Sequence, residues 1–175
     1  MRAAGFLALT MATAPVLTAV FTPALAQPAL PSRDVDVIYG AAANVQQRWR
    51  YRAADQKLRL DPPTAGLHMI IDYKAHTLAI VNDTDRTVLT LAAPPAPGAS
   101  GAAARGTDSL LGQPCTEWEQ RDVQNQPTLA CYTADGVMLR ARRGTQVLVE
   151  AIAVRYAMPD PAAFTIPASY ERVAK

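Results

Sequence analysis

The chain has 175 residues, half of them hydrophobic, and its 17 Lys and Arg residues nearly balance its 15 Asp and Glu residues. This balance argues against charge-driven binding to nucleic acid or to an anionic membrane, which needs a strongly basic surface. The length predicts one domain that is large enough to enclose a substantial hydrophobic core.

The first 26 residues have the pattern of a signal peptide. Arg2 supplies a positive charge, residues 5–21 are almost all apolar or small, and the Ala-Leu-Ala sequence at 24–26 fits a signal peptidase site. A retained N-terminal anchor is the weaker alternative, because Pro15 interrupts the run and a membrane span needs ~20 apolar residues. We therefore expect an exported protein, periplasmic or secreted, whose mature chain begins at Gln27.

An extended or mobile arm over residues 27–33 is expected to lead into a single β domain over residues 34–172. The first half of that domain alternates apolar and polar side chains with a period of two, which is typical of antiparallel strands joined by short turns. The predicted strands of this half are 35–39, 45–52, 57–61, 67–73, 76–81 and 86–91.

Residues 92–107 are rich in Pro, Gly and Ala and show neither strand nor helix periodicity. Loops of this length in a compact domain are usually disordered connectors or flaps over a functional site. We expect a flexible crossing between the two halves of the sheet, with a lid over a cavity as the alternative.

The second half predicts a hairpin around the two cysteines, strands at 137–143 and 145–156, one turn of helix at 159–164 and a packed tail. With about ten strands and little helix, the chain is expected to be mainly β. The alternatives are a sandwich and a single curved antiparallel sheet that forms a half-open barrel.

Cys115 and Cys131 are the only cysteines, and in an exported chain they are expected to form a disulfide. Two unpaired buried thiols are the alternative. If the cysteines lie directly opposite each other on antiparallel strands, the hairpin loop spans residues 122–126. A disulfide that closes a loop of this length stabilises the fold by about 3 kcal/mol in the chain-entropy model.

Several short motifs together resemble a known group of proteins. They are Lys-Leu-Arg-Leu-Asp at 57–61, Met-Ile-Ile-Asp-Tyr at 69–73, Gly-x-Pro-Cys-x-x-Trp at 112–118 and Phe-x-Ile-Pro-x-x-Tyr at 164–170. The chain resembles exported bacterial proteins of unknown function, whose sheets are similar to the half-barrel of lipoprotein-localisation carriers. The resemblance implies a curved antiparallel sheet with an apolar concave side, and it implies no known activity.

No catalytic or metal-binding motif stands out. His68 and His76 lack partners at metal-ligand spacing, residues 82–85 lack the later ligands of a calcium loop, and Ser109 is outside any G-x-S-x-G motif. We expect no enzyme activity, no cofactor and no metal, and an unrecognised hydrolase is a remote alternative.

Three arginines, Arg48, Arg50 and Arg52, alternate along one predicted strand and so share one of its faces. A solvated face that discourages edge pairing is one interpretation, and a site for an anionic partner is the other.

The opposite face of the same strands carries apolar and aromatic side chains. We expect it to bind an acyl chain, another lipid-like ligand or an apolar segment of a partner. The alternative is an envelope interaction or scaffold protein that binds through a sheet edge or the loop before residue 107. The candidate lining residues are Trp49, Tyr51, Leu58, Leu60, Met69, Ile71, Leu78 and Ile80.

Overall fold

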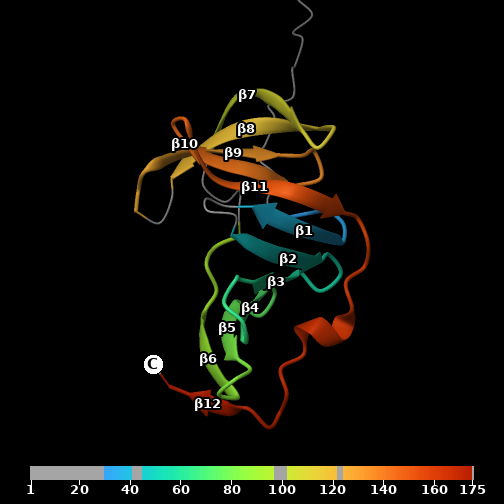
Figure 1. Cartoon of the computed structure of the whole chain (residues 1–175), viewed down its shortest axis with the longest axis vertical. Coiled ribbons are helices and arrows are strands. Elements are labelled where there is room, and N and C mark those ends of the chain that lie inside the picture. Colours follow the sequence, from blue (N-terminus) through green and yellow to red (C-terminus); the bar gives the residue numbers. More distant parts are fainter. Residues whose placement is uncertain (1–29, 41–44, 97–101, 122–123, 175) are drawn as a thin grey trace, which may run out of the picture.

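The computed structural model describes residues 30–40, 45–96, 102–121 and 124–174, which form one twelve-stranded sheet (Figure 1). The predicted signal peptide, residues 1–26, and the first part of the predicted arm lie outside the described residues. None of the helical structure in the described part of the chain is long and apolar enough to cross a membrane.

The strands follow the predicted meander closely in the first half of the chain. They are β1 (Val35–Gly40), β2 (Gln46–Arg52), β3 (Lys57–Asp61), β4 (Leu67–Asp72), β5 (Thr77–Asn82) and β6 (Thr87–Ala92). The second half contains β7 (Ala103–Leu110), β8 (Gln113–Arg121), β9 (Pro127–Tyr132), β10 (Met138–Arg143), β11 (Gln146–Arg155), the 3₁₀ turn η2 (Pro161–Phe164) and β12 (Glu171–Val173).

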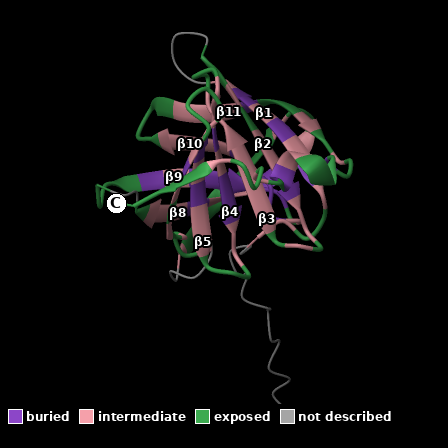
Figure 2. Cartoon of the chain, turned by 90° about the horizontal axis from the view of Figure 1, so that it is seen from below, coloured by how far each residue is buried: buried purple, intermediate pink, exposed green. Residues whose placement is uncertain are grey.

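The sheet is open, with the strand order β12-β6-β5-β4-β3-β2-β1-β11-β10-β9-β8-β7. Pairing of β1 with β11 joins the two meanders, and every neighbouring pair is antiparallel except β12 with β6. Figure 1 shows β7–β11 gathered at one end and β2–β6 curving away at the other. The strands curl around a common interior when seen from below (Figure 2). The predicted mainly-β fold, a single curved antiparallel sheet, is therefore confirmed.

The register places the predicted apolar side chains in continuous rows on one face of the sheet. Trp49 on β2 pairs with Leu60 on β3, and Leu60 pairs with Met69 on β4. Met69 in turn pairs with Ile80 on β5. A period of two in each strand and short connections between strands are enough to build such rows, because cross-strand neighbours share a face.

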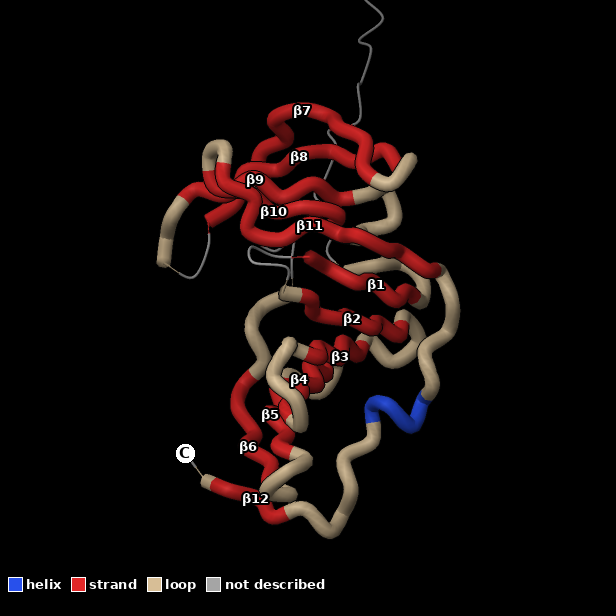
Figure 3. Tube along the Cα trace, viewed as in Figure 1, coloured by secondary structure: helices blue, strands red, loops and turns tan. Residues whose placement is uncertain are grey.

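The chain's own C-terminal segment covers the opposite face of β4–β6. Val81 and Val88 are essentially inaccessible there, and Phe164 of η2 packs against them together with Ile166 and Tyr170. Figure 3 shows η2 and the loop after it crossing beside β3–β6 before the chain ends in β12. The outer face of β4–β6 is therefore covered by the protein's own C-terminal segment.

Two strands are absent from the sequence prediction. The predicted crossing at 92–107 is too long, because residues 103–107 belong to β7, which pairs along its length with β8. Seven of the eight β7 residues are exposed, so the strand has no buried face to create a period-two pattern. β12 is only three residues long and is also fully exposed.

The cysteines are bonded as predicted, with 5.4 Å between their Cα atoms. Their predicted direct opposition is wrong: Glu117 pairs with Cys131 in the ladder, and Cys115 lies two positions before Glu117 on β8. A shift of two residues keeps every side chain on its predicted face, which is why alternation alone could not reveal it.

Candidate functional site: an apolar cavity inside the curved sheet

A cavity of about 340 Å³ lies inside the curve of the sheet. Strands β1–β4 form one wall and β8–β10 with the turn before β10 contribute the other. Its lining residues are Leu30, Pro31, Val35, Val37, Tyr39, Trp49, Tyr51, Leu58, Leu60, Ile71, Tyr73, Pro94, Pro95, Gln120, Tyr132, Gly136, Val137 and Met138.

Tyr39 and Trp49 form an aromatic pair on adjacent strands in the wall of the cavity. Their ring centroids are 4.8 Å apart and the rings are tilted by 60°. The Tyr39 hydroxyl donates a hydrogen bond of 2.6 Å to the backbone oxygen of Met138 across the interior. This bond satisfies the phenol of a side chain that is only 1% exposed, and it ties β1 to β10.

The residues just before β1, 30–33, form a short strap over one end of the cavity. Ser32 donates its backbone N–H to Asp135 O at 2.9 Å, and Arg33 Nε lies 2.5 Å from Asp135 Oδ2. Gly136 has a φ of +88°, and a Cβ there would lie 2.8 Å from the Leu30 backbone oxygen. The turn at residue 136 therefore needs glycine, because any side chain there would collide with the strap.

The cavity contains polar groups that carry no charge. None of the described residues that line it is Asp, Glu, Lys, Arg or His. Burial, followed by the nearby Tyr73 and Asp34, raises the pKa of Tyr51 to about 12. Burial, with Tyr132 second, also raises the pKa of Tyr73. These phenols are consequently neutral hydrogen-bond donors over the physiological pH range.

The indole Nε1 of Trp49 is a further donor in this wall. It is buried and has no hydrogen-bond partner among the described residues. Buried polar groups normally have partners, so a buried donor without one is unusual.

Five of the eight predicted lining residues are part of this cavity: Trp49, Tyr51, Leu58, Leu60 and Ile71. The other three, Met69, Leu78 and Ile80, do not line it. The register places Met69 on β4 and Leu78 and Ile80 on β5, all on the same face as the lining residues, and each is partly exposed. They extend the apolar wall beyond the cavity.

The sequence prediction missed the lining residues outside β2–β4. Val35, Val37 and Tyr39 show the same alternation, and that signal could have found them. The strap, the two prolines after β6 and the β9–β10 residues have no local signal. Only the curvature of the sheet brings these segments to the cavity.

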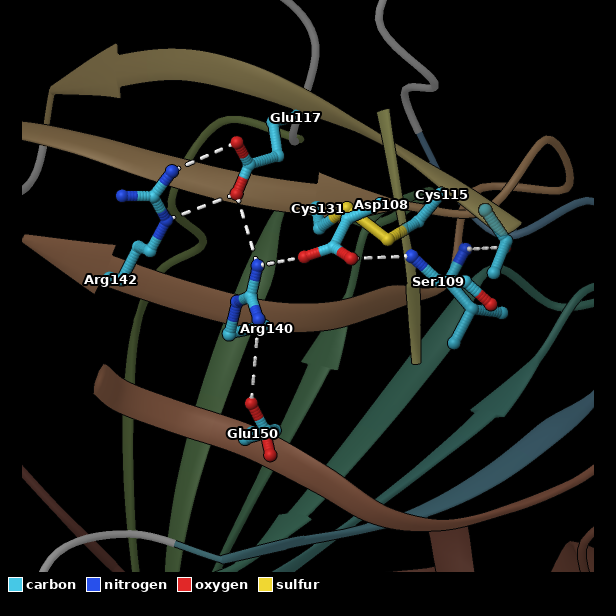
Figure 4. Close-up of a disulfide and its surroundings, with 10 residues drawn as sticks. Asp108, Ser109, Cys115, Glu117, Cys131, Arg140, Arg142 and Glu150 are labelled. Carbon is cyan, nitrogen blue, oxygen red and sulfur yellow. Dashed lines mark hydrogen bonds and ion pairs between the residues drawn. A yellow bond between two sulfur atoms is a disulfide. The ribbon is translucent and has the colours of Figure 1, made fainter. Parts of the chain in front are cut away.

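An ionic cluster surrounds the disulfide (Figure 4). Arg140 Nη2 lies 2.5 Å from Asp108 Oδ2 and 3.1 Å from Glu117 Oε1, while Arg142 holds both Glu117 oxygens at 3.0 and 2.9 Å. The hydrogen bonds from Arg142, and then from Arg140, lower the pKa of Glu117. These carboxylates are held as anions by arginine, which indicates a structural role rather than acid–base chemistry near neutral pH.

The arginines of the predicted cluster are each paired with a carboxylate. Arg48 contacts Asp36 at 2.5 Å and Arg52 contacts Asp55 at 3.1 Å. Arg50 lies 2.5 Å from Asp61, a carboxylate that Arg59 also contacts at 2.8 Å. The charge is compensated within the fold, which favours the structural interpretation over an anion site.

The histidines lie apart from the cavity lining. His68 is 5% exposed, with Nδ1 3.0 Å from Asp83 Oδ2, and the Tyr170 hydroxyl donates to the other oxygen of Asp83 at 3.0 Å. Burial, with Arg59 second, lowers the pKa of His68. Among the described residues, no group of three His, Cys, Asp or Glu side chains could hold a metal ion.

Ser109 gives no support to a hydrolase. It lies on β7, at the far edge of the sheet from the β4 strand of His68, and its backbone N–H is bonded to Asp108.

Comparisons with known proteins identify the fold and nothing further. No family model and no curated protein matches the chain. An uncharacterized conserved protein from Thermus thermophilus superposes with a TM-score of 0.58 at 11% identity, over 82% of this chain and 91% of that one.

Two crystal structures of PNGF-II are also similar. They have TM-scores of 0.59 and 0.54 at 13% identity, and each match covers 82% of this chain. The chain corresponds to only 31% of PNGF-II in one crystal form and 32% in the other. At such identities the likeness shows a shared fold alone.

Proposed function

We propose that the protein is an exported, non-enzymatic binding module that holds an acyl chain or a similar apolar ligand against the inner face of its sheet. The observation that carries this proposal is the 340 Å³ cavity, walled by aliphatic and aromatic side chains. Small-molecule sites are typically ~300–1,000 Å³, mostly apolar, with a few placed polar groups. The cavity fits the lower end of that range.

The strength of binding would come from apolar burial. Each methylene group removed from water contributes about 0.8 kcal/mol. A chain longer than the cavity would continue along Met69, Leu78 and Ile80, which lie on the same face. The site is therefore suited to a single linear chain rather than to a bulky, highly polar molecule.

The compartment is part of the same proposal. The disulfide is compatible with an oxidising compartment, and residues 1–26 have the pattern of a signal peptide. The curved open sheet is consistent with the resemblance to the half-barrel of lipoprotein-localisation carriers. We place the protein in the periplasm or outside the cell, where acyl chains of envelope lipids are available.

Titration of the purified protein with the neutral, apolar fluorescent probe N-phenylnaphthylamine tests the proposal. Leu60→Trp fills the cavity and should abolish saturable binding. Thr90→Trp adds the same side chain at an exposed position on β6 and should leave binding unchanged. The absence of saturable binding to the folded protein, or equal binding by both variants, would contradict the proposal.

The edge strand β7 supports a second candidate function, an envelope protein-interaction module. It is eight residues long, largely exposed and forms one edge of the sheet, so its outer backbone groups can pair with another strand. Photo-crosslinking in intact cells from position 107, with position 90 as the control, would give one protein adduct of constant mass. No adduct, or the same adducts from both positions, would count against this candidate.

A further inference from the structure

We infer that the cavity selects ligands whose polar end is uncharged, such as an alcohol or an ester, over ligands that end in an ionised carboxylate. This inference rests on the proposed function, because it concerns what the same cavity accepts. It specifies the polar end of the ligand, whereas the proposed function specifies only its apolar chain.

The composition of the lining is the first observation. Its polar groups among the described residues are tyrosine hydroxyls, the Trp49 indole N–H and the Gln120 amide. No lysine, arginine or histidine of the described chain lines the space, so a buried anion would have no cationic partner there. Sites that bind carboxylates or phosphates usually supply Arg or Lys for that purpose.

The charged side chains of Arg33 and Asp34, close in sequence to lining residues, do not supply an unpaired cation either. Arg33, beside the strap, is paired with Asp135 at 2.5 Å, and its guanidinium carbon lies 3.5 Å from the centre of the Tyr156 ring. On the β2 side, Asp34 accepts the Ala53 backbone N–H at 2.7 Å. Its negative charge acts on Tyr51 and would also repel an anion placed beside that tyrosine.

The remaining polar groups are suited to a neutral acceptor. Tyr51 and Tyr73 line the same space, and Trp49 adds an N–H without a partner in the described chain. An ester carbonyl or a hydroxyl oxygen could accept from such donors without bringing a charge into the interior. A neutral hydrogen bond of this kind makes a modest net contribution to affinity.

The free-energy balance is unfavourable for binding of the ionised acid. Taking a carboxylate out of water without a counter-ion costs more free energy than a single hydrogen bond returns. A hydrogen bond from a phenol to the charged group therefore offsets only part of that cost. An acid would therefore bind either after taking up a proton or with its carboxylate kept in solvent, and in both cases more weakly than the chain-matched alcohol.

Competition against the neutral probe N-phenylnaphthylamine tests this inference on the intact protein. Decanol, methyl decanoate and decanoate share one chain and differ in the polar end. At about pH 7.5, three units above the ordinary pKa of a carboxyl group, we expect the alcohol and ester to displace the probe at least tenfold more effectively than the acid. At about pH 4.5, where much of the acid is protonated, its disadvantage should shrink to a few-fold.

Decanol provides the internal control, because its apparent affinity should be the same at both pH values. Equal competition by decanol and decanoate at the higher pH would overturn the selectivity while leaving the proposed binding function in place. Failure of all three compounds to displace the probe, or of the probe to bind, would overturn both.

A pair of variants tests the cause directly. Gln120→Lys places a cation in the lining and should improve competition by decanoate about tenfold at the higher pH, with little effect on decanol. Gln120→Met removes the amide without adding charge and should leave the preference for the alcohol intact. A lysine variant that folds, binds decanol and still discriminates fully against decanoate would show that the missing cation is not the cause.

Discussion

The hydroxyl of Tyr39 on β1 donates a hydrogen bond of 2.6 Å to the backbone oxygen of Met138 on β10, 99 residues later in the chain. Both residues line the cavity. The bond connects the two meanders across the interior, so the shape of the cavity and the stability of the sheet depend on the same contact.

Tyr39→Phe removes this bond and leaves a partly buried carbonyl oxygen without that donor. We expect the free energy of unfolding to fall by ~1–3 kcal/mol, the usual cost of an unsatisfied buried polar group. Urea denaturation followed by tryptophan fluorescence measures it. Tyr170→Phe, which removes a bond to the exposed Asp83, serves as the control and should cost less. Equal losses of unfolding free energy in the two variants would show that the Tyr39 bond contributes no more to stability than the Tyr170 bond.

Gly136→Ala should destabilise the protein more than Gly112→Ala. Both glycines have positive φ, +88° and +72°, and so share the backbone cost of an L side chain, ~1–2 kcal/mol. Only at Gly136 would the new Cβ meet another segment, 2.8 Å from the Leu30 oxygen, whereas nothing lies within 4 Å at Gly112. The comparison of unfolding free energies isolates the contribution of the strap, and similar values for the two variants would contradict its close packing.

Loss of the disulfide should lower the free energy of unfolding without changing the fold. Cys115 and Cys131 are 16 residues apart, which corresponds to about 3 kcal/mol in the chain-entropy model. The double variant Cys115→Ala, Cys131→Ala should retain the far-ultraviolet circular dichroism of a β protein and unfold at lower denaturant concentration. An unchanged midpoint would contradict the stabilising role, and two free thiols in the wild-type protein purified under oxidising conditions would contradict the bond itself.

The Arg142–Glu117 pair predicts an acid-sensitive contribution to stability. Arg142, followed by Arg140, holds the folded-state pKa of Glu117 below its ordinary value. The contribution is therefore fully present above the unfolded pKa, about 4.3, and is lost as the pH falls from there through the folded value. Glu117→Gln should flatten the decline of unfolding free energy below about pH 4.5 relative to the wild type. Glu171→Gln, at an exposed position, is the control, and an equal effect from it would refute the assignment.

Local patterning predicted the strands of the first half because apolar and polar side chains alternate along most of them. In β2, Trp49 and Tyr51 alternate with arginines, and the neighbouring strands repeat the pattern in matching register. β7 and β12 have almost no buried residues, and β7 is held by backbone pairing and by the ion pairs of Arg105 and Asp108, so no buried face leaves a period-two pattern in these strands.

Long-range geometry accounts for what the sequence could not reveal about the site. Alternation assigned Leu60 and Met69 to one face, and it could not tell that the cavity includes the first and not the second. That distinction depends on where the strap and the β9–β10 residues cross the curved sheet. The cysteine register was ambiguous in the same way, because a slip of two residues preserves every face.

Native mass spectrometry of the protein, purified without detergent, tests the central claim most directly. The account predicts a species heavier than the polypeptide by one apolar ligand, which is released on unfolding, absent from Leu60→Trp and present in Thr90→Trp. A wild-type protein that carries only its own mass, and that also fails to take up an added neutral apolar probe, would contradict a binding role for the cavity.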